Sequence, residues 1–229
     1  MYTITRRRAL SGVAGAGLGG LGGCVGGTGG SGGDGGAGDA ATLDTHPAAR
    51  DLSAQPRFGP PPGEAAGTVV AFEDPSCPTC ARFERETVPR IRSELAEPGD
   101  ATFVFRVYPV VYEWGKPASR ALEATFARDD AAHWTLADHY FGDQSAFDAG
   151  NVLDRTQAFL DRQTDVDGTA VVDAVKAGEA DPAVEADRSA AADAGADGTP
   201  SLFLFRDGEY RTKAVGSVSF DVVKGALGL

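Results

Sequence analysis

A Cys-Pro-Thr-Cys motif at residues 77–80 constrains this chain more than any other feature. It follows the apolar run 68–72 and opens the amphipathic stretch 81–95, so a strand is expected to lead directly into a helix there. A thiol at a helix N-terminus faces unpaired backbone N–H groups and the positive end of the helix dipole, which favour the thiolate. Pro78 suits the first helical turn because no N–H is needed there. The motif therefore predicts a redox-active dithiol, Cys77 and Cys80, that exchanges a disulfide with a partner.

The cysteine count supports this interpretation. The chain has three cysteines, Cys24, Cys77 and Cys80. A secreted disulfide framework would use an even set at longer spacings, and a four-cysteine zinc site would need a second pair. Cys24 therefore needs a separate explanation.

The N-terminal segment provides that explanation. Arg6, Arg7 and Arg8 precede a weakly apolar, glycine-rich stretch that ends at Cys24. This order resembles a twin-arginine export signal joined to a lipoprotein processing box, in which cleavage leaves a lipid-modified cysteine as the first residue. We expect residues 1–23 to be removed and Cys24 to anchor the protein to the extracytoplasmic face of the cell membrane. The alternative is a disordered glycine-rich start with an incidental free cysteine.

Composition divides the rest of the chain. Residues 24–56 carry almost no large apolar side chains, so we expect a flexible tether. Residues 57–229 are long enough for one domain with its own core. Apolar spacing predicts strand 68–72, helix 77–97, strand 101–111, a helical block over about 116–196, a hairpin of strands 201–205 and 210–215, and a last helix 218–227 capped by Ser217.

The charge of the chain excludes one class of partner. The formal net charge is −12, and removal of residues 1–23, which contain three arginines and no acid, makes it −12 − 3 = −15. A surface this acidic repels phosphates, so no nucleic-acid partner is expected. Lysine is scarce beside arginine, aspartate and glutamate. This balance is similar to that of proteins from salt-loving archaea, in which salt screens the repulsion between acidic side chains.

The order of elements and motifs resembles the DsbA-like thiol-disulfide oxidoreductases, whose α/β fold is thioredoxin-like with an inserted helical subdomain. The resemblance covers roughly residues 66–228. It is carried by Val-Val-Ala-Phe-Glu-Asp-Pro-Ser-Cys-Pro-Thr-Cys at 69–80, His-Trp at 133–134, Tyr-Phe at 140–141 and Gly-Thr-Pro-Ser-Leu-Phe at 198–203. A Gly-Thr-Pro segment before a strand makes the Cys-X-X-Cys motif far more specific.

The resemblance implies roles for individual residues. Cys77 would be the attacking, solvent-facing thiolate and Cys80 the buried resolving thiol. Pro200 would be cis and lie beside the dithiol, and Thr199 would offer backbone groups to an extended substrate chain. The implied partners are protein thiol and disulfide substrates and a redox recycling partner that the sequence does not identify. No cofactor and no metal are expected.

The chain departs from the family pattern at two positions. Many relatives have an acid six residues before the first cysteine, where this chain has Ala71. The sequence leaves open whether Glu73 or Asp74, which are closer, substitutes for this acid. Acids before a turn are more commonly on the surface, and that is the expectation here. Strong oxidants of the family often have histidine at the third position of the motif. Thr79 brings a hydroxyl but no positive charge, which predicts weaker stabilisation of the Cys77 thiolate.

Two alternatives to a catalytic dithiol remain open from the sequence. Cys77, Cys80, His133 and His139 are ligand types that zinc accepts, although the histidine spacing only just reaches the usual window. A binding lipoprotein with a permanent Cys77–Cys80 bridge is also compatible with the motif. The aromatic residues Trp114, Trp134 and Phe141 either line a substrate groove or, as is more common in a helical block, belong to the core.

Overall fold

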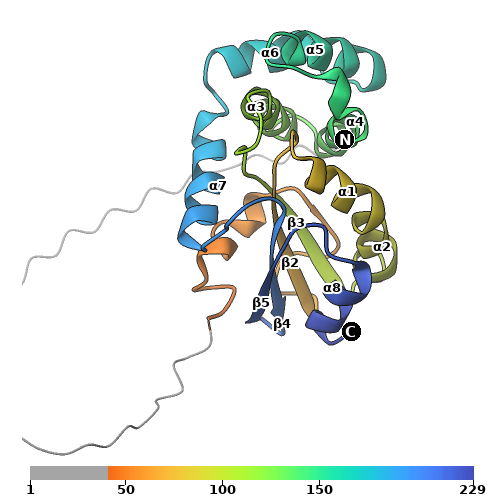
Figure 1. The fold of residues 1–229 in the computed structure, drawn as a ribbon, viewed down its shortest axis with the longest axis vertical. Coiled ribbons are helices and arrows are strands. Elements are labelled where there is room, and N and C mark those ends of the chain that lie inside the picture. The colour runs from red at the N-terminus through yellow and green to blue at the C-terminus, as the bar shows by residue number, and fades with distance from the viewer. Residues whose placement is uncertain (1–40) are drawn as a thin grey trace, which may run out of the picture. The chain divides into compact units, whose positions relative to one another are not determined.

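A five-stranded sheet forms the centre of the protein. The computed structural model describes residues 41–229, and Figure 1 shows the sheet with helices on both of its faces. The strands are β1 (Arg57–Phe58), β2 (Gly67–Glu73), β3 (Ala101–Val107), β4 (Ser201–Arg206) and β5 (Glu209–Val215), in the order β1-β3-β2-β4-β5. Strands β2 and β3 are parallel, and the other neighbouring pairs are antiparallel. The thioredoxin-like α/β fold expected from the sequence is therefore confirmed.

The segment after the motif is a broken helix, whereas the sequence predicted one continuous helix over 77–97. It consists of α1 (Pro78–Glu86), α2 (Val88–Ile91) and a π-helical turn (Arg92–Ala96). Pro89 has no N–H to donate to the preceding turn, and this interrupts the helical hydrogen bonds. The Thr87 hydroxyl at the break instead donates to the Val218 carbonyl oxygen at 2.7 Å.

Alternation along the central strands divides their side chains between two cores. Val69, Ala71, Phe103 and Phe105 face α1, α2 and the helical block, whereas Val70, Phe72 and Val104 are buried on the opposite face. Both central strands are buried along their whole length. Burial on both faces explains why these strands read as continuous apolar runs in the sequence.

The helical insertion follows the predicted pattern closely. Its helices are α3 (Gly115–Phe126), α4 (Asp130–Gly142), α5 (Val152–Gln163), α6 (Gly168–Lys176) and α7 (Asp181–Asp193), with a short 3-10 turn at Gln144–Ala146. In Figure 1, α3 to α6 form a group beyond one end of the sheet, and α7 runs back along one side of it. Ala190 and Ala191 of α7 belong to the second core, so α7 also covers the sheet.

Residues 41–56 correct the predicted boundary of the tether. They include two 3-10 turns, Pro47–Ala49 and Leu52–Ala54, and both Ala48 and Leu52 are buried against the sheet. The Leu43 N–H donates to Gly208 at 2.9 Å, and the His46 ring stacks on Tyr210 with centroids 4.5 Å apart. A few small apolar side chains are sufficient to order this segment because hydrogen bonds also attach it to the folded domain. Residues 24–40 lie outside the described part of the chain.

A buried ion pair joins this N-terminal segment, the sheet and the insertion. Arg106 of β3 and Asp187 of α7 are both about 1% exposed, with Arg106 Nη2 lying 2.7 Å from Asp187 Oδ1. Arg106 also donates to the Arg50 carbonyl oxygen at 2.7 Å, and Gln55 donates to Asp187 at 3.0 Å. The Val107 N–H adds a further bond to Asp187 at 2.9 Å. Because the charges are paired and hydrogen-bonded, they can remain buried.

The chain ends in α8 (Phe220–Leu227), which starts two residues later than predicted. Ser219, rather than Ser217, occupies the N-cap position. The carbonyl oxygen of Val218 accepts the bond from Thr87, which holds this residue outside the helix. Among residues 41–229, no helix combines the length and the apolar character needed to cross a membrane.

Candidate redox site

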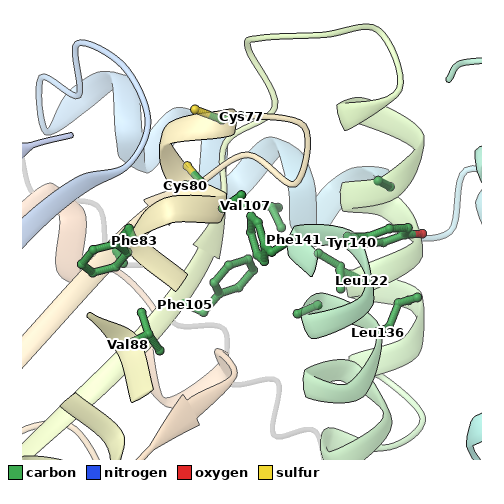
Figure 2. Packing of buried hydrophobic residues seen from close by; sticks show 14 of the residues in the cluster. Cys77, Cys80, Phe83, Val88, Phe105, Val107, Leu122, Leu136, Tyr140 and Phe141 are labelled. Atoms are coloured by element: carbon green, nitrogen blue, oxygen red, sulfur yellow. The ribbon is translucent and has the colours of Figure 1, made fainter. Parts of the chain in front are cut away.

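The dithiol lies at the junction of β2 and α1, as the sequence predicts. Cys77 is the N-cap residue of α1, Pro78 is its first residue, and Cys80 lies one turn further on. Both thiols are free, and the residues are 5% and 0% exposed. Cys77 is therefore less exposed than the expected solvent-facing position implied, although it remains the more accessible of the two. Figure 2 shows its sulfur at the end of the helix, with Cys80 closer to the apolar side chains.

Several hydrogen bonds stabilise the thiolate of Cys77. The bond from the Cys80 thiol is the largest cause, and together with Thr199 and the backbone N–H groups of Cys80 and Thr79 it lowers the pKa of Cys77 to about 5, against the opposing effect of burial. The contribution from Thr79 comes from its backbone rather than its hydroxyl. A thiol with this pKa is mostly thiolate at neutral pH, which is the nucleophilic form.

The environment of Cys80 has the opposite effect. Burial raises the pKa of Cys80 well above its usual value, and the hydrogen bond to Cys77 and the negative charge of Glu73 raise it further. Cys80 therefore stays protonated at neutral pH. The two sulfurs of one motif thus differ strongly in acidity, which separates an attacking thiolate from a thiol that must lose a proton before it reacts.

The segment before β4 lies beside Cys77. The Cys77 thiol donates to the Thr199 carbonyl oxygen at 3.3 Å, and the peptide bond from Thr199 to Pro200 is cis. Pro200 is buried, and the hydroxyl oxygen of Thr199 is enclosed without a hydrogen-bond partner among the described residues. The fold thus brings Thr199 and Pro200 to the dithiol from more than a hundred positions away, as the resemblance implied.

Asp74 holds the turn before Cys77 in place and is not the surface acid that we expected. It is fully buried, and its Oδ1 accepts hydrogen bonds from the backbone N–H of Ser76 at 2.8 Å and from the hydroxyl of Ser76 at 2.6 Å. Its Oδ2 accepts from the N–H groups of Val110 and Val111, each at 2.7 Å. These bonds end β3 at Val107, four residues earlier than predicted, because the backbone after it turns toward Asp74.

Two further residues of the site were not identified from the sequence. The Gln144 side chain donates from Nε2 to the Pro75 carbonyl oxygen at 2.7 Å and to that of Cys77 at 2.9 Å. A Cβ added at Gly115 would collide with Asp74 Oδ1 and Ser76 Oγ. Both residues come from the helical insertion, which therefore supports the turn that carries the dithiol. Neither has a local sequence signal, because each acts on a segment that is distant in the chain.

Glu73 also contradicts the expectation of a surface acid. It is the last residue of β2 and is 0% exposed. Burial, together with the nearby Glu84 carboxyl and the charge of Cys77, raises the pKa of Glu73 well above its usual value. The Cys80 thiol has the opposite and smaller effect, because it can donate to the Glu73 carboxylate. A buried acid therefore stands next to the buried thiol even though position 71 is alanine.

The histidines and aromatic residues of the insertion pack in the core or against it. The Nδ1 of the buried His133 lies 3.1 Å from the Leu122 carbonyl oxygen, and His139 stacks on Phe159 with centroids 3.9 Å apart. Within residues 41–229, no group of three or more potential ligands could hold a metal ion. The fold therefore does not bring these histidines together with the dithiol. Trp114 and Phe141 are buried, and the partly buried Trp134 stacks on Phe58.

An apolar surface adjoins the site. Val110, Val111 and Tyr112 are 50%, 43% and 57% exposed. Their backbone is fixed to the turn before Cys77, because the N–H groups of the two valines bind Asp74 and that of Tyr112 donates to Ser76 Oγ at 3.1 Å. We call these three residues the apolar loop. It offers a hydrophobic surface at a fixed position relative to the dithiol.

Fold and dithiol together define a thioredoxin-fold protein with a Cys-X-X-Cys site at the start of α1. A family model described as thioredoxin matches residues 60–216. The chain belongs to this thioredoxin family. No curated protein matches it by sequence.

Solved structures extend the comparison. Oxidised BdbD from Bacillus subtilis is 19% identical, with a TM-score of 0.66, and the match covers 84% of this chain and 100% of BdbD. DsbA2 from Pseudomonas aeruginosa is 22% identical, with a TM-score of 0.62 and coverage of 76% and 92%. DsbA from Chlamydia trachomatis is 15% identical, with a TM-score of 0.62 and coverage of 76% and 90%. At these identities the likeness shows a shared fold.

Proposed function

We propose that this protein is a thiol-disulfide oxidoreductase that exchanges disulfides with other proteins through Cys77. The observation that carries the proposal is the difference in acidity within the motif, with the pKa of Cys77 lowered to about 5 and that of Cys80 raised. A permanent structural bridge needs no such difference. Similarity to solved proteins named DsbA and BdbD supports the same activity.

The reaction proceeds through a mixed disulfide. In the oxidising direction, a substrate thiolate attacks Cys77 Sγ of the Cys77–Cys80 bridge, the bridge breaks, and Cys80 leaves and is protonated. A second substrate thiolate then attacks the substrate sulfur of the mixed disulfide, and Cys77 leaves as a stable thiolate. Two electrons pass from the substrate to the protein. A recycling partner must accept these electrons before another cycle begins.

The substrates that fit this site are extended polypeptide segments with an accessible cysteine. The apolar loop offers hydrophobic contacts beside Cys77, and the carbonyl oxygen of Thr199 contacts the Cys77 thiol. An extended chain can pair with exposed backbone while alternate side chains enter apolar contacts. The negative net charge makes a nucleic-acid partner unfavourable.

We further propose that the protein acts outside the cytoplasm, attached by a lipid on Cys24. The support for this comes from the sequence alone, through the twin arginines, the apolar stretch and the cysteine in that order. These residues lie outside the described part of the structure. An extracytoplasmic location would supply substrates whose cysteines form lasting disulfides. The excess of acidic residues would suit a salt-rich surrounding.

Trapping of mixed disulfides tests the proposed activity. In the Cys80→Ser variant the resolving thiol is absent, so reaction of Cys77 with a disulfide-containing protein should accumulate a covalent complex that a reductant dissolves. Cys77→Ser should neither trap nor exchange. Equal trapping by the two variants would refute the assignment. A wild-type protein whose dithiol exchanges with no disulfide would instead support a binding protein with a structural bridge.

A further inference from the structure

The side chain of Gln144 lies against the turn that carries the dithiol. Its Nε2 donates to the Pro75 carbonyl oxygen at 2.7 Å and to the Cys77 carbonyl oxygen at 2.9 Å. Both hydrogens of the amide nitrogen are used in these bonds. Gln144 is 67 positions from Cys77 in the chain and belongs to the helical insertion. One side chain of the insertion thus holds two peptide groups of the turn, one on each side of Ser76.

The turn itself supplies only part of the hydrogen bonding of these two carbonyl groups. Among residues 41–229, no backbone N–H binds the Pro75 carbonyl oxygen, so Gln144 provides its hydrogen bond. The Cys77 carbonyl oxygen accepts the N–H of Ala81 at 3.1 Å, the first hydrogen bond of α1, and has a second lone pair for Gln144. Loss of the amide would leave the Pro75 carbonyl group less restrained and the Cys77 carbonyl group held from one side.

The direction of the Cys77 carbonyl group affects the sulfur. Cys77 is the N-cap residue of α1, with φ −78° and ψ 120°. The angle ψ sets both the direction of this carbonyl group and the side from which the next N–H groups approach the side chain. After the Cys80 thiol and Thr199, the backbone N–H groups of Cys80 and Thr79 add to the hydrogen bonds that lower the pKa of Cys77. An N-cap side chain normally accepts from these two positions of a helix. A donor that fixes the carbonyl group therefore also fixes the hydrogen bonding of the sulfur.

Gln144 is held in place by the aromatic residues of the insertion. It begins the 3-10 turn Gln144–Ala146, and its carbonyl oxygen accepts the N–H of Phe147 at 3.2 Å. The buried Phe147 ring stacks on Trp114 with centroids 5.2 Å apart and meets Tyr140 edge-on, also at 5.2 Å. The position of the amide is therefore set by packed rings and not by a free loop.

We propose that Gln144 is a positioning residue for the attacking thiolate, because its bonds to the carbonyl oxygens of Pro75 and Cys77 keep Cys77 in the conformation in which the sulfur meets the free N–H groups of α1. The inference rests on the proposed oxidoreductase activity and deepens it, since it gives the helical insertion a share in the reactivity of Cys77. Gln144 acts through the peptide groups of the turn and not on the sulfur itself.

A neutral amide suits this role by charge as well as by shape. The two carbonyl oxygens carry partial negative charge, and a neutral donor between them adds no charge near the thiolate. A glutamate at position 144 would present a carboxylate, which only accepts hydrogen bonds, to the same two oxygens. Its negative charge would also oppose that of the Cys77 thiolate. Because glutamate and glutamine have nearly the same shape, this substitution separates hydrogen-bond donation from size.

Titration of the Cys77 thiolate in two variants tests the inference. Gln144→Met keeps the length of the side chain and removes both donors, so it should raise the pKa of Cys77 above the wild-type value of about 5. Gln144→Glu removes the donors and adds a charge, so it should raise that pKa further, on the order of 1 above the wild-type value. The measurement is the pH dependence of the difference in ultraviolet absorbance between the reduced and disulfide forms.

The reduction potential provides a second measurement. A higher pKa of Cys77 destabilises the reduced form, and a rise of about 1 corresponds to a roughly tenfold change in the exchange equilibrium, or about 30 mV toward more negative potential. Equilibration with glutathione buffers should show this change for Gln144→Glu and a smaller one in the same direction for Gln144→Met. A merely structural Gln144 would lower the unfolding midpoint of both variants without changing the pKa or the potential.

Gln157→Glu is the matched control. The Gln157 amide donates to the Thr169 hydroxyl at 2.9 Å, and this bond joins α5 to α6 within the insertion. The control therefore also removes a donor from the insertion and adds a charge to it. It should leave the pKa of Cys77 and the potential of the dithiol at their wild-type values.

An unchanged pKa of Cys77 in both Gln144 variants would overturn the inference and leave the oxidoreductase intact. A rise in Gln144→Glu alone would overturn it as well, since only the introduced charge would then act. The inference also fails if Gln157→Glu changes the pKa as much as Gln144→Met does, because the cause would then be a loosened insertion. A wild-type dithiol that exchanges no disulfide would instead refute the proposed function.

Discussion

The Cys77 thiol donates to the carbonyl oxygen of Thr199 across 3.3 Å, although the two residues are 122 positions apart in the chain. This contact joins the start of α1 to the segment before β4. The backbone of Thr199 therefore lies against the sulfur of Cys77. A substrate chain that pairs with the segment before β4 would bring its cysteine to Cys77.

The side chain of Thr199 is expected to tune the acidity of Cys77. The Thr199 hydroxyl has no other hydrogen-bond partner among the described residues, and an O–H turned toward the sulfur stabilises the thiolate and lowers the pKa of Cys77. Thr199→Val, which keeps the shape and removes the hydroxyl, should therefore raise that pKa above the wild-type value of about 5. Thr79→Val should change it less, because Thr79 acts through its backbone N–H. The measurement is a pH titration of the thiolate ultraviolet absorbance. A larger effect from Thr79→Val would reverse the assigned roles.

The lowered pKa of Cys77 also predicts the direction of exchange. A stabilised thiolate favours the reduced protein and so makes the disulfide a better oxidant. Thioredoxin, with a pKa of about 7, has a potential of about −270 mV, and DsbA, with about 3.5, has about −120 mV. A pKa of about 5 places this couple between them. Equilibration with glutathione buffers measures the potential, and a value below that of thioredoxin would argue for a reductase.

The membrane anchor makes a separate prediction. Lipid on Cys24 should place the protein in the membrane fraction, and Cys24→Ser should release it or block its maturation. Replacement of Arg6 and Arg7 by lysine should leave precursor inside the cell if export uses the twin-arginine route. Fractionation and immunoblotting of the full chain check both results. Normal export of the lysine variant would indicate another pathway.

The sequence predicted the dithiol and its surroundings where the signal was local. The apolar run before Cys77, the proline at position 78 and the Gly-Thr-Pro segment before Ser201 are each local signals for the backbone found there. The resemblance to the DsbA-like family then placed Thr199 and Pro200 at the same site. The spacing of apolar residues alone could not have predicted this. The helical block was also predictable, because its helices carry regular apolar spacing.

The errors have a common physical cause, which is contact with distant parts of the chain. Glu73 and Asp74 look like surface acids in sequence, but their partners are α1 and the backbone after β3. Residues 41–56 look like a linker, but the carbonyl oxygens of Ala48 and Arg50 accept hydrogen bonds from the buried Arg106. A single sequence shows the donors and acceptors of such contacts without showing which ones meet.

The turn before Cys77 should be sensitive to a single methyl group at Gly115. Since an added Cβ would meet Asp74 and Ser76, Gly115→Ala should displace the carboxylate that holds the apolar loop and should slow disulfide exchange. Gly142→Ala is the matched control, because a Cβ there meets nothing within 4 Å. Exchange rates and unfolding midpoints of the two variants provide the comparison. Equal exchange rates would show that the Asp74 contacts do not position the dithiol.

Removal of Asp187 from its buried pair with Arg106 should destabilise the protein far more than removal of an exposed acid on the same helix. Asp187→Asn leaves the Arg106 guanidinium buried without its counter-charge, which typically costs about 3–5 kcal/mol of unfolding free energy. Asp193→Asn removes the partner of Arg50 in a pair whose side chains are about half exposed, and such pairs contribute about 0–1 kcal/mol. Urea unfolding of both variants measures the difference.

Because Arg106 also binds the carbonyl oxygens of Ala48 and Arg50, Asp187→Asn should in addition expose residues 41–56 to protease before the rest of the domain. Cleavage there at the wild-type rate would mean that the ion pair does not hold the N-terminal segment.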